Sequence, residues 1–176
     1  LIIVSGLETD NYATHTNQED IVAIKKQIAE GSNYIEFLGR VPNQKVLELL
    51  RISHIAALPT YADTYGYFVL EAQASGCPVI STDIRALPEI NNNEAGWIIN
   101  VPKNEDGNAV LKTLENKQTY HDILVSKLYD IFSLILNDSE EIEVKAKKSL
   151  ERIKQNHDPA TQAAKIEAIY NKALGL

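Results

Sequence analysis

The sequence predicts an α/β fold built on a Rossmann-like, doubly wound parallel sheet. One observation is the alternation of short apolar runs with segments of helical period, joined by short loops, along residues 1–100. A second is the segment 54–82, which has the pattern of a buried strand, a glycine-containing turn, a helix and another buried strand. Since parallel crossovers are right-handed, we expect the carboxyl ends of all strands to lie along one edge of the sheet.

Local patterns place each element of the first hundred residues. The segment Thr16-Asn-Gln-Glu19 has the form of a capping box, which predicts the start of a helix. Ile21, Ile24 and Ile28 follow at helical spacing and form its apolar stripe. The expected elements are a strand at 1–4, a helix from 16–19 to Gly31, a strand at 34–38, a helix that starts at 42–43, a strand at 54–58, a helix at 67–75, and strands at 79–82 and 97–100.

The helix at 67–75 is the centre of the predicted site. It follows a turn that contains Gly66, and Gly76 stands where a helix C-cap belongs. The first backbone N–H groups of such a helix have no helical partner and face the carboxyl edge of the sheet, which suits phosphate. Asp63 precedes the turn and Glu71 follows one turn into the helix, where its carboxylate could bind a ribose diol or be a solvated charge favoured by the helix dipole.

The run from Asp63 to Pro78, with Glu71-Ala-Gln-Ala-Ser-Gly-Cys-Pro-Val and then Leu87-Pro88-Glu89-Ile90, resembles the donor half of a retaining glycosyltransferase. The family is the group-one class with the two-domain GT-B fold, whose signature is acid-x7-Glu-Ala-x-Ala-x-Gly-x-Pro-Val and then Pro-Glu. The resemblance implies one half of a GT-B enzyme with extra C-terminal helices. It implies sugar transfer from a nucleotide diphosphate sugar, with retention at the anomeric carbon and no metal or other cofactor.

The resemblance also implies residue roles. Glu71 is expected to bind the ribose, and Asp63 to contact the donor sugar or to orient the turn. Backbone groups of Thr64, Tyr65 and Gly66 are expected to hold sugar hydroxyls, and the N–H groups of Tyr67 and Phe68 to stabilise the diphosphate. The run Phe37-Leu-Gly-Arg-Val-Pro42 matches the family's base-binding loop, so Arg40 and Val41 are candidates for the base pocket, with Arg40 alternatively an exposed loop residue. Gly6 either approaches the nucleotide or forms a structural turn.

Three departures from the family pattern bear on function. The first acid is Asp63 where the family usually has Glu, so its contact could shift or run through water. Arg85 and Ala86 stand where two glycines are usual, and Arg85 either adds positive charge near the diphosphate or caps a changed loop. Residues 102–117 look like an insertion with a short helix.

The C-terminal part is helical. We expect helices at 120–136, at 140–155 and at 160–173, with a break at His157-Asp158-Pro159. The predicted division is a donor-binding domain at 1–157, lacking its first strand and helix, and a C-terminal helix at 158–176. The chain starts within a strand and contains no Met, so we expect it to be an excerpt of a longer protein whose missing N-terminal domain meets a glycan, lipid or protein acceptor.

Composition narrows the functional classes. The net charge of −7 argues against nucleic acid and against unaided membrane binding, so membrane association is expected only through the missing part. A single cysteine, Cys77, excludes an internal disulfide and favours the cytoplasm, and scattered histidines make a metal site unexpected. Two alternatives to the transferase are another nucleotide-sugar enzyme, such as an epimerase or phosphorylase, and a non-catalytic domain with a degenerate donor site.

Overall fold

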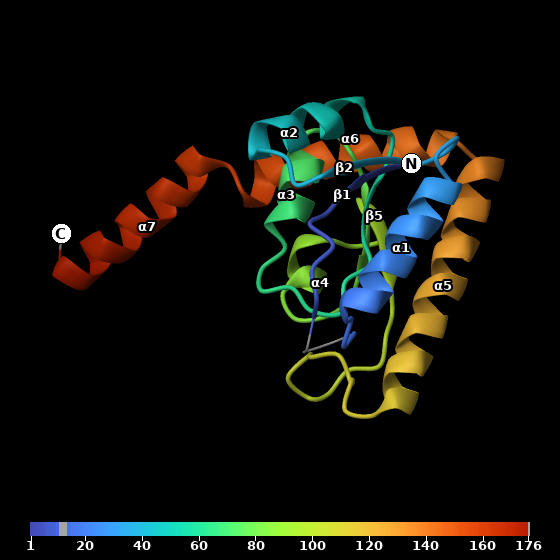
Figure 1. The fold of residues 1–176 in the computed structure, drawn as a ribbon. Coiled ribbons are helices and arrows are strands. Elements are labelled where there is room, and N and C mark those ends of the chain that lie inside the picture. The colour runs from blue at the N-terminus through green and yellow to red at the C-terminus, as the bar shows by residue number, and fades with distance from the viewer. Residues whose placement is uncertain (11–13, 176) are drawn as a thin grey trace.

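The computed structural model describes residues 1–10 and 14–175 (Figure 1). Strands and helices alternate through the first hundred residues, and helices follow, as the sequence predicts. The elements are β1 (Ile2–Val4), α1 (Gln18–Glu30), β2 (Glu36–Gly39), α2 (Asn43–Ile52), β3 (Ala56–Leu58), α3 (Tyr67–Ala74), β4 (Val79–Thr82), α4 (Leu87–Ile90), β5 (Gly96–Ile99), α5 (Leu114–Asn137), α6 (Glu140–Asn156) and α7 (Pro159–Leu174).

All strand pairs are parallel, which confirms the predicted class, but the strands form two sheets instead of one. β1 pairs with β2, and β4 lies between β3 and β5. The two sheets correspond to the flanks of the doubly wound order 3-2-1-4-5-6, in which one strand stands between the equivalents of β1 and β3. Among the described residues no strand takes that central place, so the carboxyl ends do not form one continuous edge.

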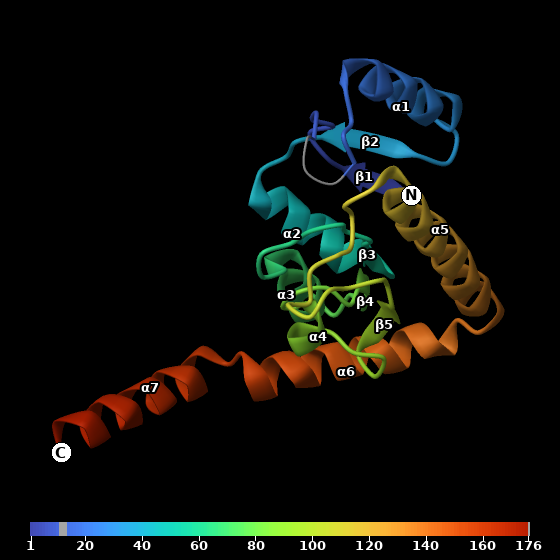
Figure 2. The same ribbon diagram turned by 90° about the horizontal axis from the view of Figure 1, so that it is seen from below.

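The hydrophobic core surrounds β4, whose four residues are all buried. Ile80, Trp97 and Ile99 of the sheet pack with Tyr120 and Leu124 of α5. By contrast, Ile21 is the one buried side chain among the described residues before Leu50, and Ile2 and Val4 of β1 are 37% and 40% exposed. Figure 2 shows β1, β2 and α1 on one side of the molecule and α6 along the other. The β1–β2 unit is therefore peripheral to the core.

A pair of buried amide side chains fixes α3 to the sheet. Gln73 of α3 donates from Nε2 to the carbonyl of Ile90 and to Oδ1 of Asn91, at 2.9 and 3.2 Å. Asn91 in turn donates from Nδ2 to the carbonyl of Val79 and to the Ser81 hydroxyl, at 3.0 and 2.9 Å. Buried polar groups with such partners specify one arrangement, because any shift would leave them unsatisfied.

The starts of α1 and α5 differ from the sequence prediction, and capping hydrogen bonds set where each helix begins. The capping box of α1 is formed by Asn17 and Asp20, one residue after the predicted Thr16 and Glu19, because Asn17 Oδ1 accepts from both Glu19 N and Asp20 N. In the 102–117 segment the predicted short helix is absent as a separate element. The first α-helix after β5 is α5, which begins at Leu114 with Thr113 as its cap.

The C-terminal helices confirm the predicted break near His157. α6 ends at Asn156, and α7 begins at Pro159 with the Asp158 side chain as its cap. α7 extends away from the rest of the protein and buries none of its described side chains (Figures 1 and 2). None of the helices in residues 1–10 and 14–175 combines the length and the apolar character needed to cross a membrane. The division into 1–157 and 158–176 stays a prediction.

The buried hydroxyl of Tyr120 gives a stability prediction. Tyr120 is fully buried, stacks on Tyr61 with 4.7 Å between ring centroids, and donates to the Thr60 carbonyl at 2.8 Å. We expect Tyr120→Phe to lower the free energy of unfolding by about 1 kcal/mol, the usual net contribution of one hydrogen bond, in urea titration followed by circular dichroism. The matched control is Tyr129→Phe on the same helix, where the side chain is 74% exposed. Equal effects of the two substitutions would contradict the prediction.

Candidate functional site

The amino end of α3 is open, as the sequence predicts. Gly66 is its N-cap in the left-handed conformation, with φ of 82°, and its carbonyl accepts from Val69 N at 2.9 Å. No side chain of the described residues caps this end. The N–H groups of Tyr67 and Phe68, at the first two helical positions, therefore remain available to an anion.

Gly66 is required at this turn for two reasons. Its positive φ disfavours any residue with a Cβ. A Cβ built on it would also lie 2.6 Å from Leu87 Cδ2 and 2.7 Å from Ile90 Cδ1, closer than packed atoms approach. The turn is thus pressed against α4, which sets where α3 begins.

Asp63 orients the turn before α3. Its Oδ1 accepts a hydrogen bond from Tyr65 N at 3.0 Å, which is one of the two roles that the sequence leaves open. Thr64, Tyr65 and Tyr67 are exposed, and the rings of Tyr65 and Tyr67 lie 5.0 Å apart. The backbone of 64–66 is therefore held in shape by the chain itself, while its side chains face solvent.

Glu71 points away from the interior and toward α2. It is partly buried, and its Oε1 accepts a hydrogen bond from Asn43 Nδ2 at 2.8 Å. Asn43 is the first residue of α2 and directly follows the loop that contains Arg40 and Val41. This one contact brings together two predicted parts of the site that are 28 residues apart in the sequence.

Gly6 and Arg40 also lie together. A Cβ on Gly6 would lie 2.7 Å from Arg40 Nε, so the arginine side chain packs directly against the glycine. Arg40 forms an ion pair with Glu8, in which both side chains are mostly exposed. Such a pair contributes little to stability and leaves Arg40 accessible. Val41 is partly buried in the loop before α2.

Arg85 anchors the 102–117 segment. Its φ is 48°, its backbone N donates to the Gly107 carbonyl at 2.9 Å, and its Nε donates to Asn108 Oδ1 at 2.8 Å. Nearby, Lys103 forms an ion pair with the carboxylate of Asp83 and donates to the Asp83 carbonyl. Of the two roles left open by the sequence, these hydrogen bonds correspond to the changed loop.

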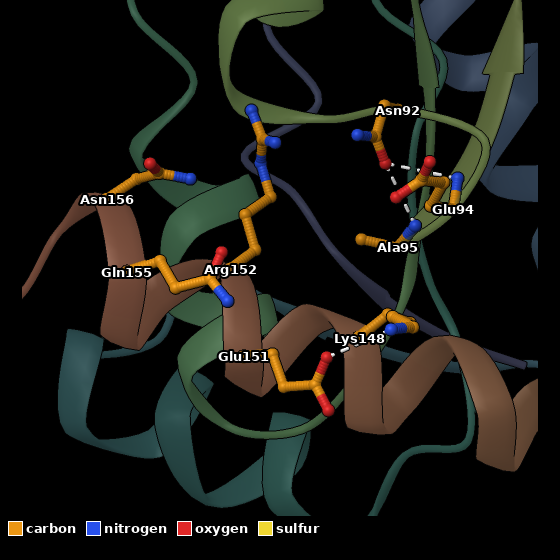
Figure 3. A pocket seen from close by; sticks show the side chains of 8 residues that line it. All are labelled: Asn92, Glu94, Ala95, Lys148, Glu151, Arg152, Gln155 and Asn156. Carbon is orange, nitrogen blue, oxygen red and sulfur yellow. Dashed lines mark hydrogen bonds and ion pairs between the residues drawn. The ribbon is translucent and has the colours of Figure 1, made fainter.

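Two hollows lie outside the α3 end itself. The one in Figure 3 has a volume of about 130 Å³ and lies between α6 and the turn before β5. It is smaller than the roughly 300–1,000 Å³ typical of ligand pockets, and Arg152 in it bonds the carbonyls of Glu89 and Ile90. The second, of about 490 Å³, lies beside Tyr61, on the loop that leads to Asp63, and is bordered by His121 of α5. This second hollow therefore lies between the start of α5 and the loop that precedes α3.

Cys77 is buried in the core, and burial raises the pKa of its thiol to about 11, which keeps it protonated and unreactive. Within the part of the chain that the structure describes, no three His, Cys, Asp or Glu side chains gather as a metal site would require.

Solved structures share this architecture. The chain matches sucrose-phosphate synthase from Thermosynechococcus elongatus with a TM-score of 0.65 and 16% identity, over 99% of this chain and 38% of that one. It matches Anabaena HepE, solved in complex with UDP, with a TM-score of 0.67 and 18% identity, over 97% and 40%. The fold is that of the Rossmann-like domains of GT-B glycosyltransferases.

Sequence comparison identifies the family. The sequence model of the glycosyl transferases group 1 matches residues 15–127, more than half of the chain. The chain belongs to the glycosyl transferases group 1. A D-inositol 3-phosphate glycosyltransferase of Rhodococcus erythropolis (strain PR4) is 30% identical over 48% of this chain and 20% of its own length. One of Corynebacterium glutamicum (strain R) is 25% identical over 80% of this chain and 28% of its own length. The match thus spans between 20% and 28% of the length of these relatives.

The Gly66 geometry predicts a large loss of stability on substitution. We expect Gly66→Ala to lower the free energy of unfolding by about 2–4 kcal/mol, because left-handed strain contributes about 1–2 kcal/mol and overpacking about 1–3 kcal/mol. Gly39→Ala is the control, since Gly39 has φ of 65° and nothing within 4 Å of a built Cβ. Denaturant titration should give only the backbone cost, about 1–2 kcal/mol, for the control. The prediction is wrong if both variants lose the same amount.

The buried thiol of Cys77 predicts slow chemical labelling. Its pKa of about 11 means that the thiolate is scarce at pH 7–8, and burial denies access to reagents. We expect Ellman's reagent to label the folded protein much more slowly than the urea-unfolded protein, where one thiol per chain should react at once. Rapid labelling of the folded protein would contradict the assignment of Cys77 to packing.

Proposed function

We propose that this chain is the donor-binding domain of a retaining glycosyltransferase of the hexosyl type. It would move a sugar from a nucleotide diphosphate sugar to an acceptor. The observation that carries the proposal is the hydrogen bond between Asn43 and Glu71, which links α3, one turn after its open end, to the residue that follows the loop at 39–42. A nucleotide needs a base pocket, a ribose acceptor group and an anion site within one nucleotide's reach, and the link between α3 and the start of α2 supports such an arrangement.

The chemistry requires stabilisation of a departing diphosphate. As the sugar becomes oxocarbenium-like, negative charge gathers on the leaving group, and preorganised donors lower the barrier. The N–H groups of Tyr67 and Phe68 would point at this charge, aided by the dipole of α3. Because the helix end supplies this positive potential, we propose that transfer requires no metal or other cofactor.

The remaining roles follow from position. Glu71 would bind the ribose diol, while Gly6, Arg40 and Val41 would line the base. Backbone groups of Thr64, Tyr65 and Gly66 would hold the donor-sugar hydroxyls. Asp63 would keep the turn in shape through its bond to Tyr65 N, with its second oxygen free to meet the sugar.

The class of acceptor is proposed for the whole protein and not for this chain alone. The relatives named above are D-inositol 3-phosphate glycosyltransferases that extend well beyond the matched region, and the solved neighbours include complexes with UDP and UDP-glucose. We propose a glycan, lipid or protein acceptor held by an N-terminal domain, and a cytoplasmic enzyme of bacterial-type glycan synthesis. This chain alone would bind donor weakly and transfer nothing detectable.

Calorimetric titration of the full-length protein with UDP and GDP tests the donor site. We expect one of the two to bind, and Glu71→Ala to lose roughly 1–3 kcal/mol of binding free energy, since a charged hydrogen-bonding group is removed. The control is Glu48→Ala, an exposed glutamate of the neighbouring helix α2. If neither nucleotide nor a sugar-linked form binds, the transferase proposal fails. If Glu71→Ala matches the control, the ribose lies elsewhere.

A further inference from the structure

We propose that Asn43 is a positioning residue that holds the Glu71 carboxylate for recognition of the ribose diol of a nucleoside diphosphate. The inference rests on the proposed function and names a residue that the sequence motifs do not single out. Asn43 stands at the first position of α2, outside the Asp63–Glu71 segment. Its link to the site is visible only in the folded chain.

The hydrogen bond defines how the two side chains face each other. Asn43 Nδ2 donates to Glu71 Oε1 at 2.8 Å. An ionised carboxylate only accepts hydrogen bonds, so the amide nitrogen and not its oxygen must face Glu71. Among the described residues, no further side-chain donor bonds this carboxylate, which leaves Oε2 open to hydroxyl donors. A vicinal diol presents two such donors side by side.

An amide suits this role better than a charged partner. Lysine or arginine in place of Asn43 would neutralise Glu71 and compete with the ribose for its oxygens. The amide occupies one oxygen and leaves the charge in place. It also restricts the rotamers of a three-torsion side chain before the ligand arrives, which removes an entropic cost from binding. The amino end of α2, where Asn43 lies, adds a positive partial potential on the same side.

The test compares ribose and deoxyribose ligands on matched variants. The full-length protein would be titrated with UDP and GDP, and then with the 2′-deoxy form of the nucleotide that binds. The variants are Asn43→Ala, Glu71→Ala, the double variant, and Gln44→Ala as the control. Gln44 is the next residue of the same helix turn, is exposed, and forms no side-chain bond that the structure records. It therefore reports any effect of helix propensity alone.

We expect Asn43→Ala to weaken the ribonucleotide by about tenfold and the 2′-deoxynucleotide much less, so that discrimination between them falls. The double variant should bind like Glu71→Ala, because Asn43 acts only through Glu71. Gln44→Ala should bind like the wild type. Equal weakening of both nucleotides, additive effects in the double variant, or an Asn43→Ala variant that binds like Gln44→Ala would each overturn the inference.

A second substitution at Asn43 tests the hydrogen bond to Glu71 without shortening the side chain. Asn43→Asp has nearly the same shape but places two carboxylates face to face, which raises the pKa of the pair. One of them then binds a proton as the pH falls and can donate to the other. We expect affinity of this variant for the ribonucleotide to recover at pH 5 relative to pH 8, unlike that of Asn43→Ala. An affinity of Asn43→Asp that is lowered equally at pH 5 and pH 8 would overturn the inference. If the wild type binds no nucleotide, the proposed function itself fails.

Discussion

The candidate site depends on where α3 starts, and the buried amides of Gln73 and Asn91 fix that helix to the sheet. Asn91 reaches the carbonyl of Val79 and the hydroxyl of Ser81, so α3 is registered against β4 through polar bonds in the core. Apolar packing alone would allow α3 to slide along the sheet, whereas sliding would break these hydrogen bonds. Gly66 is therefore held against Leu87 and Ile90, and this contact fixes the position of the open end of α3 relative to the loops around it.

Much of the fold and the local part of the site could be predicted from the sequence, because they depend on short-range patterns. The α3 unit is one strand, one glycine turn and one helix, and the sequence alone places Asp63 before the turn and Glu71 one turn into the helix. The start of α1 was misplaced by one residue because Thr16 and Asn17 both can cap a helix. What decides between them is which side chain reaches the N–H groups of Glu19 and Asp20.

Sequence reasoning missed the contacts between distant segments. Asn43 with Glu71 and Arg85 with Asn108 depend on how α2 and the 102–117 segment pack against the rest, and no periodicity encodes that. The split into two sheets was missed for a related reason. Each strand has the apolar composition of a buried parallel strand, and that composition does not specify which strands become neighbours. With no described strand between β1 and β3, two separate sheets result.

The peripheral position of β1 and β2 has a consequence for how the molecule would respond to a ligand. Gly6 and Arg40 belong to a segment in which Ile21 is the one described buried side chain, whereas α3 lies in the core. Segments with few buried contacts open locally at a lower free energy than the core. A nucleotide that touched both would stabilise residues 1–10 and 14–41 against local opening and slow amide hydrogen exchange there, while the exchange of β4 would stay as slow as before.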